Sequence, residues 1–406
     1  MLRDRLPFLL PTLLLGGVAA AVLSSRADAG PGNAPLGTAP DLIVGDIQDY
    51  IKYGTSGGLS SYAFGTTSCN IGNETLTWNA NTNNHPVISG TVYRLKDGVL
   101  EQLGINWLKH GFATLNQNLC GTCQPTNGTK LGIGCSDPYS ASLNGSQSNL
   151  GPRMEVNAYD GFFPYPPTLN PTGGVLGGRV QIANGDIDPA LNGTARYFVE
   201  AHYIHQEDSA LIGNGTNNVS YREIDFTGAA APYSVTFVAP TVRQSTVIEA
   251  WQAIDPNITL TEFNFTGDGG MFLASSVTQL SATSWKYVYA LYNRDSDRGA
   301  RGLGIPVALS ASVTNRTFRD IAYHSGETAL GTDWTVVDGP VSSVPRAIGW
   351  MTGSWNQNTD NNGLRWGTAY TMSFTCDRAP VAGQAAVVGF KNGAQAYVLV
   401  NAQIPQ

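Results

Sequence analysis

Polar and apolar residues alternate with a period of two in many segments between about residue 85 and the C-terminus. Successive side chains of a β-strand point to opposite faces of a sheet, so this period is typical of strands with one buried face. After the first 29 residues, no stretch of 12 or more residues carries an apolar stripe of helical period. The sequence therefore predicts an all-β chain with one or two antiparallel β-sandwich domains, jelly-roll or immunoglobulin-like, and long loops.

Two pairs of predicted strands are joined by dipeptides that favour tight turns. Asp97-Gly98 joins Thr91–Lys96 to Val99–Leu103, and Asn392-Gly393 joins Ala386–Lys391 to Ala394–Val400. Both dipeptides tolerate positive φ, which a two-residue hairpin turn requires. Further strands are predicted at Arg196–Ile204, Tyr233–Val238, Thr246–Ile254, Ile258–Phe265 and Trp285–Tyr292.

The first 29 residues have the order of a secretory signal. Arg3 and Arg5 precede an apolar stretch, Leu6–Leu23, and Ala27-Asp28-Ala29 then provides a cleavage site with small residues. The stretch is interrupted by proline and glycine and is short for a membrane span, which needs roughly 20 apolar residues. We therefore expect removal of residues 1–29, with a retained anchor as the alternative, and no transmembrane span in the mature chain. The expected location is secreted, extracellular or at the cell surface, with the periplasm as an alternative.

Proline marks the expected divisions of the mature chain. Residues 30–40 contain three prolines among small residues and are expected to form a flexible lead-in. Phe163–Pro171 contains four prolines, which cannot donate ladder hydrogen bonds, and is predicted to be a linker. We accordingly expect a loop-rich, disulfide-stapled β region at 41–170 and a β-sandwich region at 171–406.

The charge of the chain excludes one class of partner. Charged residues make up only 13% of the sequence, and the formal net charge is −7. Binding to a phosphate backbone depends on clustered Lys and Arg, and the sequence contains no basic run. We therefore expect no nucleic-acid partner and no attraction to an anionic membrane surface.

Four of the five cysteines are expected to pair among themselves in two disulfides, because an exported protein meets an oxidising compartment. These four are Cys69, Cys120, Cys123 and Cys135. Their pairing cannot be assigned from the sequence, and Cys376 is expected to be free. The alternative is a zinc site in which Cys120, Cys123 and Cys135 provide three sulfur ligands and His110 provides a nitrogen.

The predicted strand at 196–204 carries a His-x-x-His pattern that resembles a metal-ligand spacing. His202 and His205 are three residues apart, however, and would point to opposite faces of a strand, so they cannot share one ion. Glu200 and His202 are two apart and share a face. Such a pair is either an acid–base pair or an ordinary polar pair.

Three loops, which begin at Asn184, Asn293 and Asn358, repeat a spacing of oxygen donors that suits a hard cation such as calcium. None completes an EF-hand loop, because none has glutamate at the twelfth position. Turn formation is the alternative, since Asn and Asp also favour turns. Calcium is therefore the one candidate cofactor. Its candidate ligands are Asp186, Asp188, Asp295, Asp297 and Asp360.

Tryptophans between residues 349 and 368 are candidate ligand-binding residues. Trp350, Trp355 and Trp366 lie among Asn and Thr, and a flat ring face beside amide donors suits a sugar. Burial in a core is the alternative.

The sequence contains no nucleophile elbow and no phosphate-binding loop. A hydrolase with two carboxylates needs no local motif, because its acids meet only in the fold, about 5 to 9.5 Å apart. Candidates by location are Glu200, Glu249, Glu262, Glu327 and Asp333.

Four segments resemble a family of uncharacterised exported bacterial β-rich proteins. They are Trp107–Phe112, Gly132–Gln147, Tyr323–Glu327 and Leu364–Thr368. The resemblance implies export and a β-rich architecture, and it carries no activity.

Low charge, abundant turns and the lack of catalytic motifs favour an exported binding or structural module over an enzyme. Its expected partner is a glycan or a cell-envelope polymer. One alternative is a secreted carbohydrate-active hydrolase with paired carboxylates. Another is an envelope or matrix protein that self-assembles through exposed strand edges.

Overall fold

The structure, a computed structural model, describes residues 39–146, 148–323, 326–341 and 344–406. These residues form an almost entirely β-sheet molecule, which confirms the predicted fold class. The described strands pair in antiparallel ladders. The predicted leader at 1–29, and the predicted lead-in up to residue 38, lie outside the described residues.

Residues up to about 245 form two sheets that face each other and make the N-terminal sandwich. The outer N-terminal sheet consists of β1 (Leu42–Ser56), β2 (Leu59–Asn70) and β10 (Val180–Ala183) in that order, with β8 (Ser136–Tyr139) paired to β2. The inner N-terminal sheet consists of β13 (Ser234–Phe237), β12 (Val219–Thr227), β11 (Arg196–Ile204), β4 (Val87–Lys96), β6 (Leu108–Lys109) and β9 (Leu150–Gly151), with β5 (Val99–Ile105) paired to β4. Strands β3 (Leu76–Thr77) and β7 (Lys130–Leu131) form a separate ladder. The connecting loops hold α1 (Ala141–Asn144) and the short 3-10 turns η1 (Arg153–Glu155), η2 (Asn184–Asp186), η3 (Ala210–Ile212) and η4 (Gly215–Asn217).

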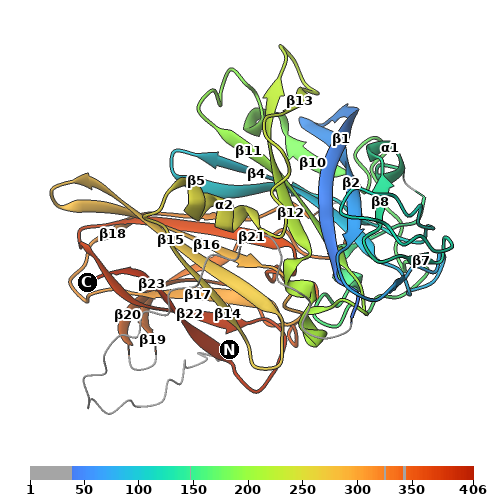
Figure 1. The fold of residues 1–406 in the computed structure, drawn as a ribbon. Helices are drawn as coiled ribbons and strands as arrows, with labels where there is room; N and C mark the ends of the chain where they lie inside the picture. Colours follow the sequence, from blue (N-terminus) through green and yellow to red (C-terminus); the bar gives the residue numbers. More distant parts are fainter. Residues whose placement is uncertain (1–38, 147, 324–325, 342–343) are drawn as a thin grey trace.

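Two further sheets form the C-terminal sandwich, which Figure 1 shows in yellow to red beside the blue and green N-terminal sandwich. The inner C-terminal sheet consists of β14 (Thr259–Asn264), β15 (Gly270–Ser281), β16 (Ser284–Asn293), β21 (Thr368–Cys376) and β18 (Val313–Arg319). The outer C-terminal sheet consists of β19 (Thr335–Val341), β20 (Val344–Met351), β17 (Ala300–Pro306), β22 (Pro380–Gly389) and β23 (Tyr397–Pro405).

The two inner sheets are buried on both faces. Because successive side chains of a strand point to opposite faces, each inner strand contributes to two apolar layers. On β16, Tyr289 and Leu291 point into the core of the C-terminal sandwich, whereas Val288 and Ala290 point the other way. That second set meets side chains of the inner N-terminal sheet, so four sheets stack in sequence with three apolar layers between them. We call the layer between the two inner sheets the middle layer. Its buried residues are Tyr93, Leu95, Leu100, Phe198, Val247, Ile248, Trp251, Ile258, Phe272, Ala274, Val288, Ala290, Tyr292 and Ala369.

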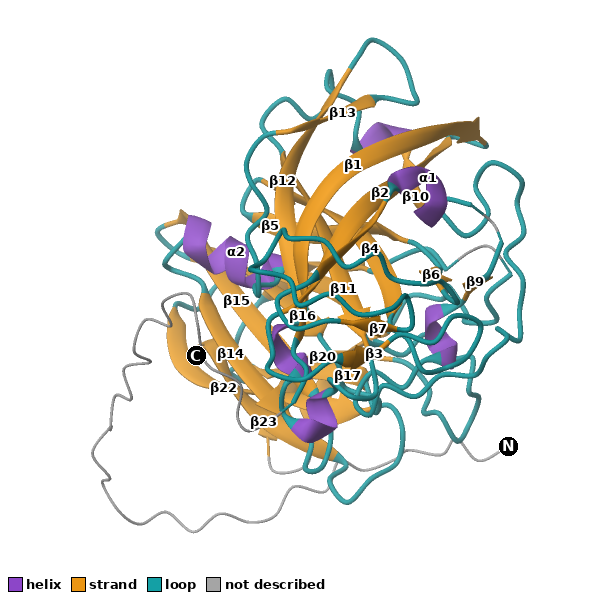
Figure 2. Ribbon diagram, turned by 45° about the vertical axis from the view of Figure 1, so that its right-hand side comes forward, coloured by secondary structure: helices purple, strands orange, loops and turns teal. Residues whose placement is uncertain are grey.

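The segment Thr246–Ile254, predicted to be a strand, is a helix, α2 (Val247–Ile254), which lies between the two inner sheets (Figure 2). Thr246 caps it: its hydroxyl accepts the Glu249 N–H, and the Glu249 carboxylate accepts the Thr246 N–H at 2.8 Å. This capping box is visible in the sequence as Thr-x-x-Glu. The β-branched content of the segment favoured a strand, and eight residues are too few for a convincing helical stripe.

The first predicted hairpin is confirmed in detail and the second in outline. Asp97 and Gly98 have φ of 52° and 71°, so both central residues adopt positive φ as expected for a two-residue turn between β4 and β5. Strands β22 and β23 also form a hairpin, but their pairing ends at Val388 and Tyr397. The loop between them is therefore longer than predicted, and within it the carbonyl oxygen of Gln395 accepts a hydrogen bond from Arg298 Nη2 at 2.7 Å.

The sheets do not divide at the proline-rich segment 163–171. Strand β10, beyond that segment, pairs with β2, and β11 pairs with β4. The change from one sandwich to the other falls instead between β13 and β14, so the expected boundary at residue 170 does not coincide with a division between sheets. A proline-rich loop can connect two strands of the same sheet as well as two domains. Residue composition alone does not distinguish these two cases.

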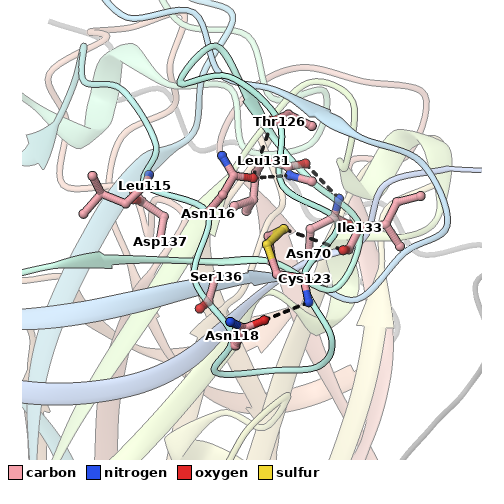
Figure 3. The surroundings of a disulfide bond; sticks show 12 residues. Asn70, Leu115, Asn116, Asn118, Cys123, Thr126, Leu131, Ile133, Ser136 and Asp137 are labelled. Carbon is pink, nitrogen blue, oxygen red and sulfur yellow. Dashed lines mark hydrogen bonds between the residues drawn. A yellow bond between two sulfur atoms is a disulfide. The ribbon is translucent and has the colours of Figure 1, made fainter.

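Two disulfides join the four cysteines that were expected to pair: Cys69 with Cys120 and Cys123 with Cys135. Cys376 is free, as expected, and the structure shows that it is also buried. The loop around the second disulfide is fixed by side chains such as Asn118, whose Oδ1 accepts the Cys123 N–H at 3.0 Å (Figure 3). The sulfurs of the alternative zinc site are thus bonded to other sulfurs.

No helix in the described part of the chain is long and apolar enough to cross a membrane.

Candidate functional site: a cleft between the two sandwiches

A cleft of about 500 Å³ opens between the N-terminal and C-terminal sandwiches. One wall includes Leu103 on β5, Gln181 on β10 and Asp186 at the end of η2, together with Leu59 and Ala183. The other wall consists of the end of β18 and the residues that follow it, 318–323, together with Gly331 and Asp333. The cleft therefore exists only because strands far apart in the sequence stack face to face.

A second recess of about 690 Å³ lies beside the first, and Phe318 and Arg319 line both. The first holds three acidic side chains and one basic one, so we call it the acidic recess. The second is lined by four basic side chains, among them Lys96 and Lys286, and two acidic ones, so we call it the basic recess. A ligand that spans both would meet opposite charges at its two ends.

Asp186 holds the two walls together at the boundary of the recesses. Its Oδ1 lies 3.1 Å from Arg94 Nη1 of the N-terminal sandwich, and its Oδ2 lies 2.6 Å from Arg319 Nη2 of the C-terminal sandwich. Arg94 also contacts Glu101 at 2.6 Å. This chain of ion pairs crosses the cleft, and both oxygens of Asp186 are committed to it.

Asp320 is the carboxylate with the most unusual environment in the acidic recess. Burial raises its pKa to about 6, the amide of Asn362 lowers it, and the nearby charge of Asp333 raises it. Asn362 Nδ2 donates to Asp320 Oδ2 and so fixes the carboxyl group. Asp320 thus lies in the acidic recess with a carboxyl group held by one hydrogen bond and a raised pKa.

An aromatic side chain separates the recesses. Phe318 is half-buried, and its ring stacks on the buried ring of Trp334 with centroids 5.5 Å apart and an interplanar angle of 21°. Trp334 is held in turn by a hydrogen bond from its Nε1 to the carbonyl oxygen of Asn362 at 2.5 Å. The ring of Phe318 is therefore a fixed apolar surface beside Asp320.

Of the three tryptophans predicted to contact a ligand, Trp355 and Trp366 line one small pocket and Trp350 does not. Trp350 is fully buried in the core of the C-terminal sandwich, and Trp366 is 3% exposed and donates to the Arg153 carbonyl oxygen at 3.0 Å. Only Trp355 is partly exposed, where it packs against Phe390. A ligand-binding role for Trp350 is excluded by its burial: it lies on β20 with its side chain on the inward face of that strand.

The loops predicted to bind calcium have their carboxylates matched by protein groups. Asp186 contacts two arginines, as described above. Asp295 is buried against Arg294 Nε at 2.9 Å, and Asp297 contacts Lys391 Nζ at 2.7 Å. Asp188 accepts the Ala190 N–H at 2.9 Å, and Asp360 accepts the Thr328 hydroxyl at 2.7 Å. Among the described residues, no three His, Cys, Asp or Glu side chains come together to hold a metal.

Glu200 and His202 share a face of β11, as predicted, but that face is the middle layer. Both side chains are buried, with 2% and 3% exposure. Burial lowers the pKa of His202 to about 3, and the charges of Arg294 and Arg153 lower it further, so the ring is neutral. His205 uses its two ring nitrogens on the backbone of Thr77 and Glu207. We therefore assign these residues to the core.

The remaining candidate carboxylates have different surroundings, and the carboxylate of Glu327 lies near the buried guanidinium of Arg153. Glu249 caps α2, and Glu262 pairs with Arg294 at 3.0 Å. Asp333 is the only member of the predicted set among the acids that line the acidic recess. Asp320, Arg319 and Phe318 were not among the residues predicted from the sequence. The only sequence feature that could have indicated them is the succession of an aromatic, a basic and an acidic residue at the end of a strand.

No family model matches the sequence, and no curated protein matches it. One similar solved structure is that of a serine-rich repeat adhesion glycoprotein from Streptococcus agalactiae, at 9% sequence identity and a TM-score of 0.22. The alignment covers 92% of this chain and 99% of that chain.

Proposed function

We propose that this chain is an exported binding protein that holds part of a carbohydrate polymer in the cleft between its sandwiches. The observation that carries the proposal is the acidic recess, which Asp320, Asp333 and Phe318 line together. Carboxylates accept hydrogen bonds from sugar hydroxyls, and an aromatic ring packs against the apolar face of a sugar. A volume of about 500 Å³ is in the usual range for a small-molecule site.

The two disulfides support the proposed location outside the cytosol. Disulfides persist in oxidising compartments and are rare in the cytosol. Together with the expected leader, they favour a secreted or cell-surface protein with a glycan or envelope polymer as partner.

Glycan-array screening of the purified chain, followed by calorimetry with the best oligosaccharide, tests the proposal. We expect Phe318→Ala and Asp320→Asn each to weaken binding by roughly tenfold or more. A tenfold change corresponds to a loss of about 1.4 kcal/mol of binding free energy. Phe162→Ala and Asp225→Asn are matched controls, because both residues are exposed and lie outside the cleft. Equal affinities for all four variants, or the lack of any glycan ligand, would contradict the proposal.

A second candidate function rests on the raised pKa of Asp320. At pH values below about 6 it is protonated beside the exposed Asp333, the combination that a carboxylate-based glycoside hydrolase uses. Release of reducing ends from the bound polymer, abolished in both Asp320→Asn and Asp333→Asn, would establish this activity. If the polymer is bound and no product is released, the chain is a binding protein without this hydrolase activity.

A further inference from the structure

Two carboxylates that do not line the cleft are buried close together, Asp41 just before β1 and Asp208 in the loop after β11. Asp41 is 4% exposed and Asp208 is fully buried. Asp208 Oδ2 accepts the Leu42 N–H at 2.7 Å, and Asn217 Nδ2 donates to Asp41 Oδ1 at 3.1 Å. Both acids therefore have fixed positions in one hydrogen-bonded cluster.

The described residues provide no positive charge for this pair. The ion pairs of the described side chains involve neither Asp41 nor Asp208. Burial raises the pKa of both groups, and the proximity of Asp41 raises that of Asp208 further. Buried charges are normally paired or bound to a metal, so the pair requires either an added proton or an added cation.

The loop that carries Asp208 holds several buried side-chain oxygens that have no hydrogen-bond partner. Among the described residues, the buried side-chain oxygens without a hydrogen-bond partner include Asp208 Oδ1, Ser209 Oγ, Asn217 Oδ1 and Asn218 Oδ1. Asn218 is fully buried, and its Nδ2 donates to the Asp208 carbonyl oxygen at 3.2 Å, which places its amide beside Asp208. A shared proton would neutralise one carboxylate, but it would leave these other oxygens unsatisfied at a cost of roughly 1 to 3 kcal/mol each.

We propose that Asp41 and Asp208, with the side-chain oxygens of Ser209, Asn217 and Asn218, bind one divalent cation, and that this cation is calcium. All the donors are oxygens, which hard cations prefer, and no nitrogen or sulfur donor that would favour zinc is among them. Two carboxylates balance a charge of +2. Calcium accepts a mixture of carboxylate, amide and hydroxyl oxygens together with water, whereas magnesium requires a stricter octahedron.

The proposed cation joins two distant parts of the chain. Asp41 directly precedes β1, an edge strand of the outer N-terminal sheet, and residues 208–218 form the loop between β11 and β12. Calcium would therefore hold the first strand of the fold to the inner N-terminal sheet.

Metal analysis of the full chain tests this inference. The purified protein is treated with a chelator, dialysed against calcium chloride, and examined by atomic emission and calorimetry. We expect one equivalent of calcium with a dissociation constant of about 10⁻³ M or tighter, a calcium-dependent rise in Tm, and weaker binding of magnesium. A chain that binds no calcium, with a Tm indifferent to chelator, would overturn the proposal in favour of a shared proton.

Three variants locate the site. Asp208→Asn keeps an oxygen for the Leu42 N–H but removes a charge, so we expect it to abolish calcium binding. Asn217→Ala changes a residue that is only half-buried, so calcium binding can still be measured in this variant if Asp208→Asn folds poorly. We expect Asn217→Ala to bind calcium about tenfold more weakly. Asp188→Asn is the matched control, since its carboxylate serves the 188–190 turn, and it should bind as the unchanged protein does. Calcium affinity that falls in Asp188→Asn but not in the other two would refute the assignment.

Discussion

Glu200 shows how one side chain can connect three parts of the molecule. Its Oε1 accepts hydrogen bonds from the hydroxyls of Tyr93 on β4 and Tyr292 on β16, at 3.2 and 3.1 Å. Its Oε2 accepts the Val247 N–H at the start of α2, at 2.7 Å. A carboxylate at a helix N-terminus is favoured by the helix dipole. Glu200 thus joins both inner sheets and the helix between them, which explains a buried acid in an apolar layer.

We predict that Glu200 makes the stability of the fold depend on pH. Burial raises the pKa of Glu200 from 4.5 to about 7. The three hydrogen bonds that its carboxylate accepts and the charge of Arg153 lower the pKa, but burial has the larger effect. Because the folded state holds the proton more tightly than the unfolded chain, the resulting stability is complete below about pH 4.5 and is lost as pH rises through about 7. The shift corresponds to roughly 3 kcal/mol.

Urea unfolding of the unchanged protein and of Glu200→Gln, measured at several pH values, checks this prediction. Glutamine does not titrate, so we expect the difference in unfolding free energy between the two proteins to change by roughly 3 kcal/mol between about pH 4.5 and 7. Other titrating groups are present in both proteins and cancel. Parallel stability curves would show that Glu200 keeps one protonation state over this range.

At the scale of the element, α2 depends on its cap as well as on its packing. Val247, Ile248 and Trp251 are buried in the middle layer. An eight-residue helix is too short to be stable alone, and its first N–H groups need partners. Thr246, Glu249 and Glu200 provide them. This accounts for a helix in a segment whose composition favours a strand.

We therefore predict that Thr246→Ala lowers the free energy of unfolding by about 1 kcal/mol, because the cap hydroxyl is lost. Thr246→Ser keeps the hydroxyl and should lose much less. Chemical denaturation of the two variants, with helix content followed by circular dichroism, measures the difference. Equal loss in both would mean that the methyl group of Thr246, which is 2% exposed, matters more than its cap.

At the scale of the whole molecule, the two sandwiches share the middle layer instead of meeting at a polar interface. Val288 and Ala290 of one sandwich and Phe198 of the other are all buried there. Separation of the sandwiches would expose this layer and break the bonds to Glu200. The cleft lies at the rim of the same contact, so its shape depends on the sandwiches staying together.

We predict that both sandwiches unfold in a single transition. Calorimetry should show one peak, and Ala290→Asp, which places a charge in the middle layer, should shift the whole peak to lower temperature through a loss of about 3 kcal/mol or more. Leu280→Asp, at a residue of the C-terminal sandwich that is 56% exposed, is the control and should have little effect. Two peaks, of which Ala290→Asp moves only one, would show that the sandwiches fold independently.

The sequence by itself determined the β class, the strand at 196–204, the Asp97-Gly98 turn and the group of four cysteines that pair. These features follow from the alternation of side chains and from backbone preferences that act over a few residues. Only the tertiary structure decided that β11 is buried on both faces, that Trp350 is core, and that Asp320 and Asp333 line one cleft with Asp186. The same holds for Asp41 and Asp208, which are adjacent only in space. Such contacts depend on how sheets stack and which strands pair. No local sequence pattern predicts this stacking and pairing, because the residues involved lie far apart in the chain.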